Sequence, residues 1–244
     1  MTGFSNPTSP AFARIAGAFY LLIAVSGGYA IAYAPTTWHV PGDPVATLDA
    51  IRLHSGYYLS GIAGDVVMMS AEVIVTAMLY VMFRHVNPTL SLAAALARFA
   101  MVAVMSAMLL LHAGIFAIAQ DAVPLSNMSQ GVAAEMLYLL LYMHDAGVWV
   151  WQVFFTLHLV ILGWLVAASG LFPRLIGLGL MIGGTGYLAD SVYAFALPDV
   201  SSLGVIRVAL LAVVTLSEIG FALWLIFVGP REPRQSSVLR AVQA

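Results

Sequence analysis

The sequence contains no cysteine and no lysine, and only 8% of its 244 residues are charged. Without cysteine there is no disulfide, no thiolate metal site and no cysteine nucleophile. Without lysine, a retinal Schiff base and a lysine nucleophile are excluded. Soluble domains usually have roughly a quarter of their residues charged. The shortage of charge, together with a hydrophobic share of 62%, therefore indicates an integral membrane protein.

Long apolar runs account for most of the chain. A run of about 20 residues is enough to cross the roughly 30 Å hydrocarbon layer as a helix. Such runs lie at residues 13–34, 57–83, 92–118, 144–168, 174–196 and 205–228. The alternating ten-residue segments typical of outer-membrane barrels are absent. The sequence predicts an all-α fold: an integral membrane six-helix bundle formed by one domain over residues 1–228, followed by a short polar tail at 229–244.

The positions of the nine basic residues, all arginine, predict the orientation of the bundle. Cytoplasmic segments of membrane proteins carry an excess of positive charge. If the N-terminus is cytoplasmic, Arg52 and Arg207 lie outside, and all other arginines lie on or near the cytoplasmic side. These others are Arg14, Arg84, Arg98, Arg174, Arg231, Arg234 and Arg240. We therefore expect both termini to be cytoplasmic.

The two longest connections between spans fall on the outer side in this orientation. Residues 35–55 include a turn rich in proline and glycine, after which Thr47 is placed to cap a short helix at the membrane surface. Residues 119–143 contain helix-capping side chains and are expected to lie flat before the fourth span begins. The stretch GLGLMIGGTG at 177–186 lies inside the fifth span and indicates close packing between helices.

Four ionisable residues are expected near the middle of the membrane. At 1.5 Å per residue, Glu72, His158 and Glu218 each lie about 15 Å from the cytoplasmic boundary, and the long side chain of Arg98 can reach the same level. Ionisable groups at this depth are costly, so they face the bundle interior and often mark a functional site. Burial favours their uncharged forms, which brings proton exchange toward neutral pH. The alternative is that Arg98 neutralises a carboxylate and that the four residues only fix helix packing.

A second polar layer is expected nearer the outer boundary. It comprises Asp65, His112, His144, Asp145, Tyr187 and Asp190. Because transmembrane haem is held between histidines of different helices, His112 and His144 are candidate axial ligands for one b-type haem. A second haem would need a histidine 14 residues before His112, where the sequence has Arg98. A metal at the middle of the membrane would have one histidine and two glutamates, a set that selects no particular metal.

The second half of the chain carries the most specific resemblance to a known family. The sequence resembles the DUF4386 family of bacterial multi-pass membrane proteins. The resemblance is carried by residues 143–191 and 217–229, and the first and second spans also fit the family's pattern. The residues that carry this resemblance are Phe155, His158, Gly163, Ser169, Gly170, Pro173, Arg174, Gly177, Tyr187, Asp190 and Glu218. The resemblance implies a multi-pass protein of the bacterial cytoplasmic membrane and implies no activity.

These observations lead to one main hypothesis and two alternatives. The protein is expected to bind a lipophilic small molecule between its helices, with Glu72, His158 and Glu218 as catalytic acid–base groups of an isomerase, hydratase or cyclase and Arg98 as their counter-charge. The first alternative is a haem- or metal-binding membrane subunit. The second is a non-catalytic accessory subunit of a membrane complex. Membrane lipids are expected partners, whereas a net charge of −2 and the lack of a basic cluster outside the tail argue against nucleic acid.

Overall fold

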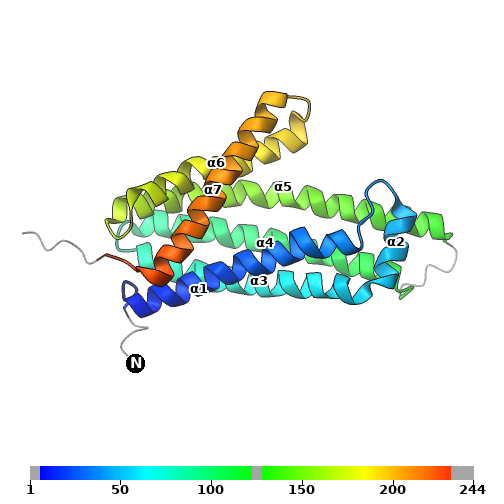
Figure 1. The fold of residues 1–244 in the computed structure, drawn as a ribbon, viewed down its shortest axis with the longest axis horizontal. Coiled ribbons are helices and arrows are strands. Elements are labelled where there is room, and N and C mark those ends of the chain that lie inside the picture. Colours follow the sequence, from blue (N-terminus) through cyan, green and yellow to red (C-terminus); the bar gives the residue numbers. More distant parts are fainter. Residues whose placement is uncertain (1–5, 123–127, 232–244) are drawn as a thin grey trace, which may run out of the picture.

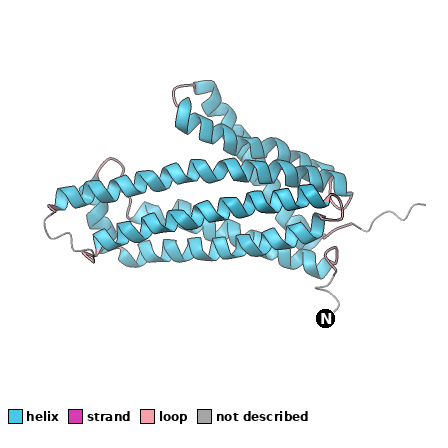
Figure 2. Cartoon of the chain, turned by 180° about the vertical axis from the view of Figure 1, so that it is seen from behind, coloured by secondary structure: helices cyan, strands magenta, loops and turns pink. Residues whose placement is uncertain are grey.

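A computed structural model describes residues 6–122 and 128–231, and within this part every regular element is a helix, with no strand (Figure 2). It contains seven α-helices. Six of its helical segments are long and apolar enough to cross a membrane. The predicted all-α fold with six spans is therefore confirmed. Arg234, Arg240 and most of the predicted tail lie outside the described residues.

The helices follow one another with short connections. They are α1 (Pro10–Gly27), α2 (Pro44–Leu53), α3 (Ser55–Phe83), α4 (Pro88–Ala119), α5 (Gln130–Ser169), α6 (Arg174–Ala196) and α7 (Ser201–Phe227). The first span does not end with α1: it continues as a π-helical turn, η1 (Gly28–Tyr33), and a 3-10 turn, η2 (Ala34–Thr37). A π-helical turn within a helix is uncommon and is often found at functional sites.

Local side chains explain where these helices begin. Ser9, Asn87 and Ser129 each accept a hydrogen bond from a backbone N–H in the first turn of α1, α4 and α5, respectively. Such caps satisfy donors that a helix leaves free at its start. Proline occupies the first position of both α1 and α4, where its missing N–H costs nothing.

Two local expectations were wrong. Residues 130–143 do not lie flat: Ser129 caps α5, which then runs without a break for 40 residues to Ser169. The surface helix does form, but Asp43 caps it through a hydrogen bond from the N–H of Ala46. Thr47 lies within α2 and its side chain is fully buried; its hydroxyl donates to the backbone carbonyl oxygens of Val40 and Asp43.

The six spans form a closed ring (Figure 1). In the order α1, α3, α4, α5, α6, α7, each packs against the next, and α7 packs back against α1. The ends of the described chain lie at one end of the bundle, which we call the terminal end, and α2 lies across the opposite end, which we call the α2 end. The hairpin of α6 and α7 diverges from the other helices toward its loop. The six spans therefore surround a common interior, and the hairpin of α6 and α7 leans away from the other four.

Glycines allow the closest helix contacts, as the glycine-rich stretch of the fifth span predicts. A Cβ atom on Gly177 would lie 2.5 Å from the carbonyl oxygen of Gly163, so α5 and α6 touch backbone to backbone. A Cβ on Gly183 would lie 2.5 Å from the backbone nitrogen of Val214 on α7. Small residues at such contacts let membrane helices pack by van der Waals attraction.

Candidate functional site

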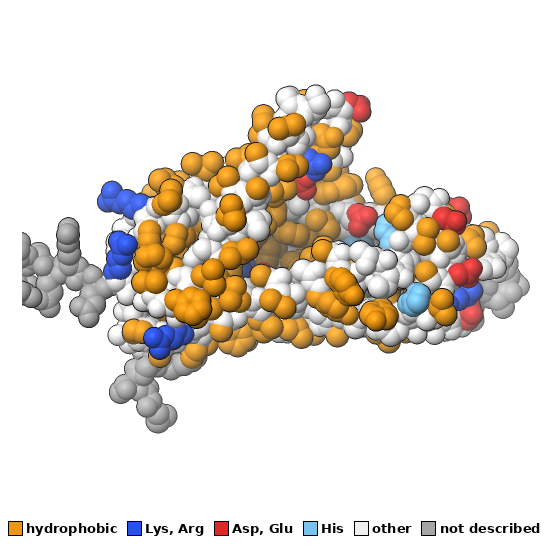
Figure 3. Space-filling view, in the orientation of Figure 1, with side chains coloured by type: hydrophobic (Ala, Val, Ile, Leu, Met, Phe, Trp, Pro, Cys, Tyr) orange, Lys and Arg blue, Asp and Glu red, His pale blue; other side chains and the backbone are white. Residues whose placement is uncertain are grey.

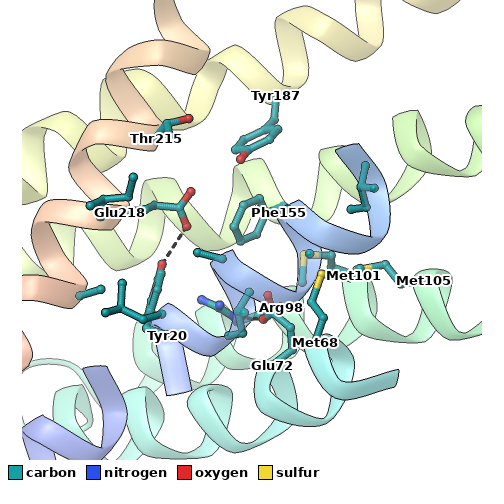
Figure 4. Close-up of a pocket in the computed structure, with 18 of the residues that line it drawn as sticks. Tyr20, Met68, Glu72, Arg98, Met101, Met105, Phe155, Tyr187, Thr215 and Glu218 are labelled. Carbon is teal, nitrogen blue, oxygen red and sulfur yellow. Dashed lines mark hydrogen bonds and ion pairs between the residues drawn. The ribbon is translucent and has the colours of Figure 1, made fainter. Parts of the chain in front are cut away.

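A cavity of about 490 Å³ lies inside the ring, and we call it the chamber (Figure 4). All six spans contribute to its wall, which is mainly apolar. Its polar side chains are Tyr20, Glu72, Arg98, Tyr187, Thr215 and Glu218. On the face drawn in Figure 3, the surface is hollowed between α1 and the diverging hairpin of α6 and α7. The chamber thus joins an apolar wall to a few polar groups, as small-molecule sites commonly do.

A buried ion pair forms part of the chamber wall. Arg98 is 1% exposed, and its Nε donates to Oε2 of Glu72. Its Nη1 lies 2.9 Å from Nε2 of His158, and Nδ1 of the same histidine lies 2.9 Å from the carbonyl oxygen of Ala94. Because the guanidinium can only donate and the carbonyl can only accept, the imidazole is uncharged and carries its hydrogen on Nδ1. His158 therefore holds Arg98 in place with both ring nitrogens already occupied.

Glu218 has a different environment. Its Oε1 accepts a hydrogen bond of 2.8 Å from the hydroxyl of Tyr20. Its side chain points into the chamber, as does that of Tyr187 (Figure 4). In the described part of the chain, no arginine forms an ion pair with Glu218. The chamber wall therefore holds one neutralised carboxylate, Glu72, and one carboxyl group, Glu218, whose hydrogen-bond partner among the described residues is the phenol of Tyr20.

The structure brings three of the four predicted midplane residues into direct contact and separates the fourth. Glu72, Arg98 and His158 form one hydrogen-bonded unit, whereas Glu218 reaches that unit through Tyr20, whose ring lies 5.0 Å from the Arg98 guanidinium carbon. His158 lies behind Arg98 and does not line the chamber. Sequence reasoning missed Tyr20, because an uncharged tyrosine in an apolar span stands out only by its hydroxyl.

The predicted outer layer is divided among three places. Asp65, His112, His144 and Asp145 line a cavity of about 200 Å³ that we call the α2-end cavity. Tyr187 instead lines the chamber. Asp190 is paired with Arg207 of α7 and accepts a hydrogen bond of 3.0 Å from Gln152 of α5, so it ties the diverging hairpin to the bundle. The six residues predicted to form one outer layer thus belong to three different sites, because depth along a helix does not fix the direction in which a side chain points.

The two histidines of the α2-end cavity are too close together to hold a haem iron between them. Their ring centroids are 4.3 Å apart, and the hydroxyl of Tyr58 lies 2.7 Å from Nδ1 of His112. Two imidazoles on opposite sides of one metal ion have nitrogens about 4 Å apart, because each metal–nitrogen bond is about 2.0 Å, and their centroids are farther apart still. His112 and His144 as placed therefore do not fit a bis-histidine haem. Over residues 6–122 and 128–231, no three histidine, aspartate or glutamate side chains converge as metal ligands.

Comparison with known proteins places the chain in a family. The model of the family described as Domain of unknown function (DUF4386) matches residues 15–229, which is most of the chain. The chain belongs to the DUF4386 family. No curated protein and no solved structure matches this DUF4386 protein.

Several residues that carry the family resemblance meet at the chamber. Phe155, Tyr187 and Glu218 line it, and His158 stands behind its arginine. Gly163 belongs to the closest contact between α5 and α6. In this DUF4386 protein, these residues of the family resemblance therefore either line one side of the chamber or pack the helices that support it.

Proposed function

We propose that this DUF4386 protein binds a lipophilic small molecule in the chamber and that Glu218 exchanges a proton with that molecule. The observation that carries the proposal is a carboxyl group in a mainly apolar chamber, held by Tyr20 and without an arginine partner in the part of the chain that the structure describes. Ionisable residues within membrane spans are rare and commonly functional. A volume of about 490 Å³ lies within the usual range of small-molecule sites.

The other polar residues have supporting roles in this proposal. Tyr20 orients Glu218 through its hydrogen bond of 2.8 Å. Arg98 and Glu72 form a neutral pair that gives the wall a fixed polar patch, and His158 positions Arg98. Glu218 is then the group that donates a proton to the ligand or accepts one from it, as an isomerase, hydratase or cyclase requires. His158 is a positioning residue here because both of its ring nitrogens are engaged.

The proposal includes a location. The six apolar helices place the chain among multi-pass membrane proteins, and we assign it to the bacterial cytoplasmic membrane with both termini in the cytoplasm. The charge pattern supports this orientation, since Arg84 and Arg174 flank helices at the terminal end. A lipophilic ligand dissolved in the membrane can then reach the chamber through the hollow beside the hairpin of α6 and α7 (Figure 3).

Mass spectrometry of copurified molecules tests the proposal. The protein is purified in lipid nanodiscs, and bound lipophilic molecules are extracted and compared between the native protein and Glu218→Gln, which keeps the shape of the side chain and removes its acid. We expect a specific molecule with the native protein and a marked loss with Glu218→Gln. The matched control is Glu135→Gln, because Glu135 is exposed on α5 and does not line the chamber.

Two outcomes would contradict the proposal. One is that the native protein and Glu218→Gln retain the same lipophilic molecules in equal amounts. The other is that the native protein retains none and instead copurifies with another membrane subunit, which is the result expected of an accessory subunit. Equal melting temperatures for the two glutamine variants would show that any loss of ligand is not a loss of folding.

A further inference from the structure

Three cavities lie in series between the α2 end and the centre of the ring. A small cavity of about 60 Å³, which we call the junction cavity, shares Asp65, His144 and Val148 with the α2-end cavity. It shares Met105 and Trp151 with the chamber. Neighbouring cavities in this series therefore share part of their lining.

Ile31 borders all three cavities. It belongs to the π-helical turn η1 (Gly28–Tyr33), which packs against α3. A π-helical turn is wider than an α-helical turn, and its hydrogen bonds are less regular. The residue common to the three cavities thus belongs to a segment whose backbone departs from the α-helix.

The chamber is closed in the opposite direction. Toward the terminal end, the ring of Tyr20 packs edge-on against Phe221, with ring centroids 5.9 Å apart. Phe221 packs against Phe172, which packs against Phe83, and each of these three phenylalanines is at most 2% exposed. These rings pack edge-on or tilted against one another, and the three buried phenylalanines have no polar atom in their side chains. The α2-end cavity, in contrast, is bordered by Asp145, whose side chain is 64% exposed, so this cavity reaches the protein surface.

The α2-end cavity has the lining of a hydrated space. It is bordered by the carboxylates of Asp65 and Asp145 and by three histidines, His39, His112 and His144. Such side chains donate and accept hydrogen bonds, and buried water occupies cavities that offer it several polar partners.

From this series we propose a route by which water and protons pass from the α2 end, through the α2-end cavity and the junction cavity, to the chamber and Glu218. The route would connect the carboxyl of Glu218 to the aqueous phase on one side of the membrane. The claim that this route delivers protons to a reaction rests on the proposed function. The claim that the route is hydrated does not. A test of water access therefore stands apart from a test of ligand binding.

Cysteine reactivity tests the route in a protein that has no native cysteine. Met105→Cys places a reporter between the junction cavity and the chamber. Leu110→Cys places a control on the same helix at a site that is 74% exposed and lines none of the three cavities. Each variant is reconstituted in nanodiscs and treated with a positively charged, membrane-impermeant methanethiosulfonate. Because the reactive species is the thiolate, which forms only where water can solvate it, we expect Met105→Cys to react at least about tenfold faster.

A second substitution tests the direction of access. Val148→Trp, combined with Met105→Cys, fills the boundary between the α2-end cavity and the junction cavity and should slow the reaction severalfold. Val150→Trp is the matched control, because it adds the same bulk to α5 at a site that is 43% exposed and outside the three cavities. The proposal is overturned if Met105→Cys reacts no faster than Leu110→Cys, or if Val148→Trp slows the reaction no more than Val150→Trp does.

Discussion

Arg98 is held from three other helices at once. Glu72 of α3 accepts from its Nε, His158 of α5 accepts from its Nη1, and the ring of Tyr20 of α1 lies 5.0 Å from its guanidinium carbon. A buried ion pair costs much of its attraction in lost hydration, so its net stabilisation is small, but removing one partner leaves an uncompensated charge. Losing one partner of the pair should therefore destabilise the fold around the chamber more than losing both partners together.

This asymmetry gives a prediction about stability. Arg98→Met should lower the free energy of unfolding by about 3 kcal/mol or more, because it leaves Glu72 buried without a partner. The double variant Glu72→Met with Arg98→Met should lose much less, since no charge remains unpaired. Thermal unfolding in a mild detergent, followed by circular dichroism, measures both. A double variant that is as unstable as Arg98→Met would contradict this account.

At the scale of single residues, counting along the spans predicted a common depth for Glu72, Arg98 and His158, and the structure brings these three side chains into contact. Counting was not enough to assign their roles. The carbonyl of Ala94 accepts from His158, and a backbone group leaves no mark in the sequence. Tyr20 was missed for a similar reason, since its importance lies in its direction toward Glu218 and not in its residue type.

At the scale of elements, the contact between α5 and α6 is set by two glycines. Gly177→Ala should reduce the free energy of unfolding by about 1–3 kcal/mol, as overpacked sites do, because its Cβ would meet a carbonyl oxygen at 2.5 Å and a backbone nitrogen at 2.7 Å. Gly220→Ala on α7 is the control, as no atom lies within 4 Å of the added carbon there. Melting temperatures of the two variants give the comparison, and equal values would count against close packing.

The sequence predicted some elements better than others. The glycine-rich stretch in the fifth span led directly to its tight contacts with α5 and α7. The start of α5 was missed, because a window of about 20 apolar residues is the length needed to cross a membrane and not the length at which a helix must end. The π-helical turn η1 was also missed, since nothing in GYAIAY distinguishes it from an α-helix.

At the scale of the whole molecule, the ring could not be derived from the sequence. Each span is apolar on most faces, so its pattern does not identify its neighbours. The ring is closed, and the chamber formed, by the contact of α7 with α1, which are the last and first spans in the sequence. Only the presence of ionisable groups on four spans suggested that those spans face a common interior.

The orientation of the ring is testable in intact cells. Asp199→Cys lies in the exposed loop between α6 and α7, and His85→Cys lies in the exposed connection between α3 and α4 at the terminal end. Because arginines favour the cytoplasmic side, an impermeant thiol reagent should label Asp199→Cys and should label His85→Cys only after the cells are opened. The reverse pattern would place both termini outside.

The length of α5 has a consequence for how the molecule meets water. With 40 residues, α5 is about 60 Å long, and even at a tilt of about 40° it exceeds the roughly 30 Å hydrocarbon layer by about 16 Å. Because α6 and α7 turn back before reaching the α2 end (Figure 1), the excess falls there, where α2 covers it. This part of the protein stands clear of lipid as a rigid epitope, and an antibody fragment raised against it could bind without entering the detergent belt.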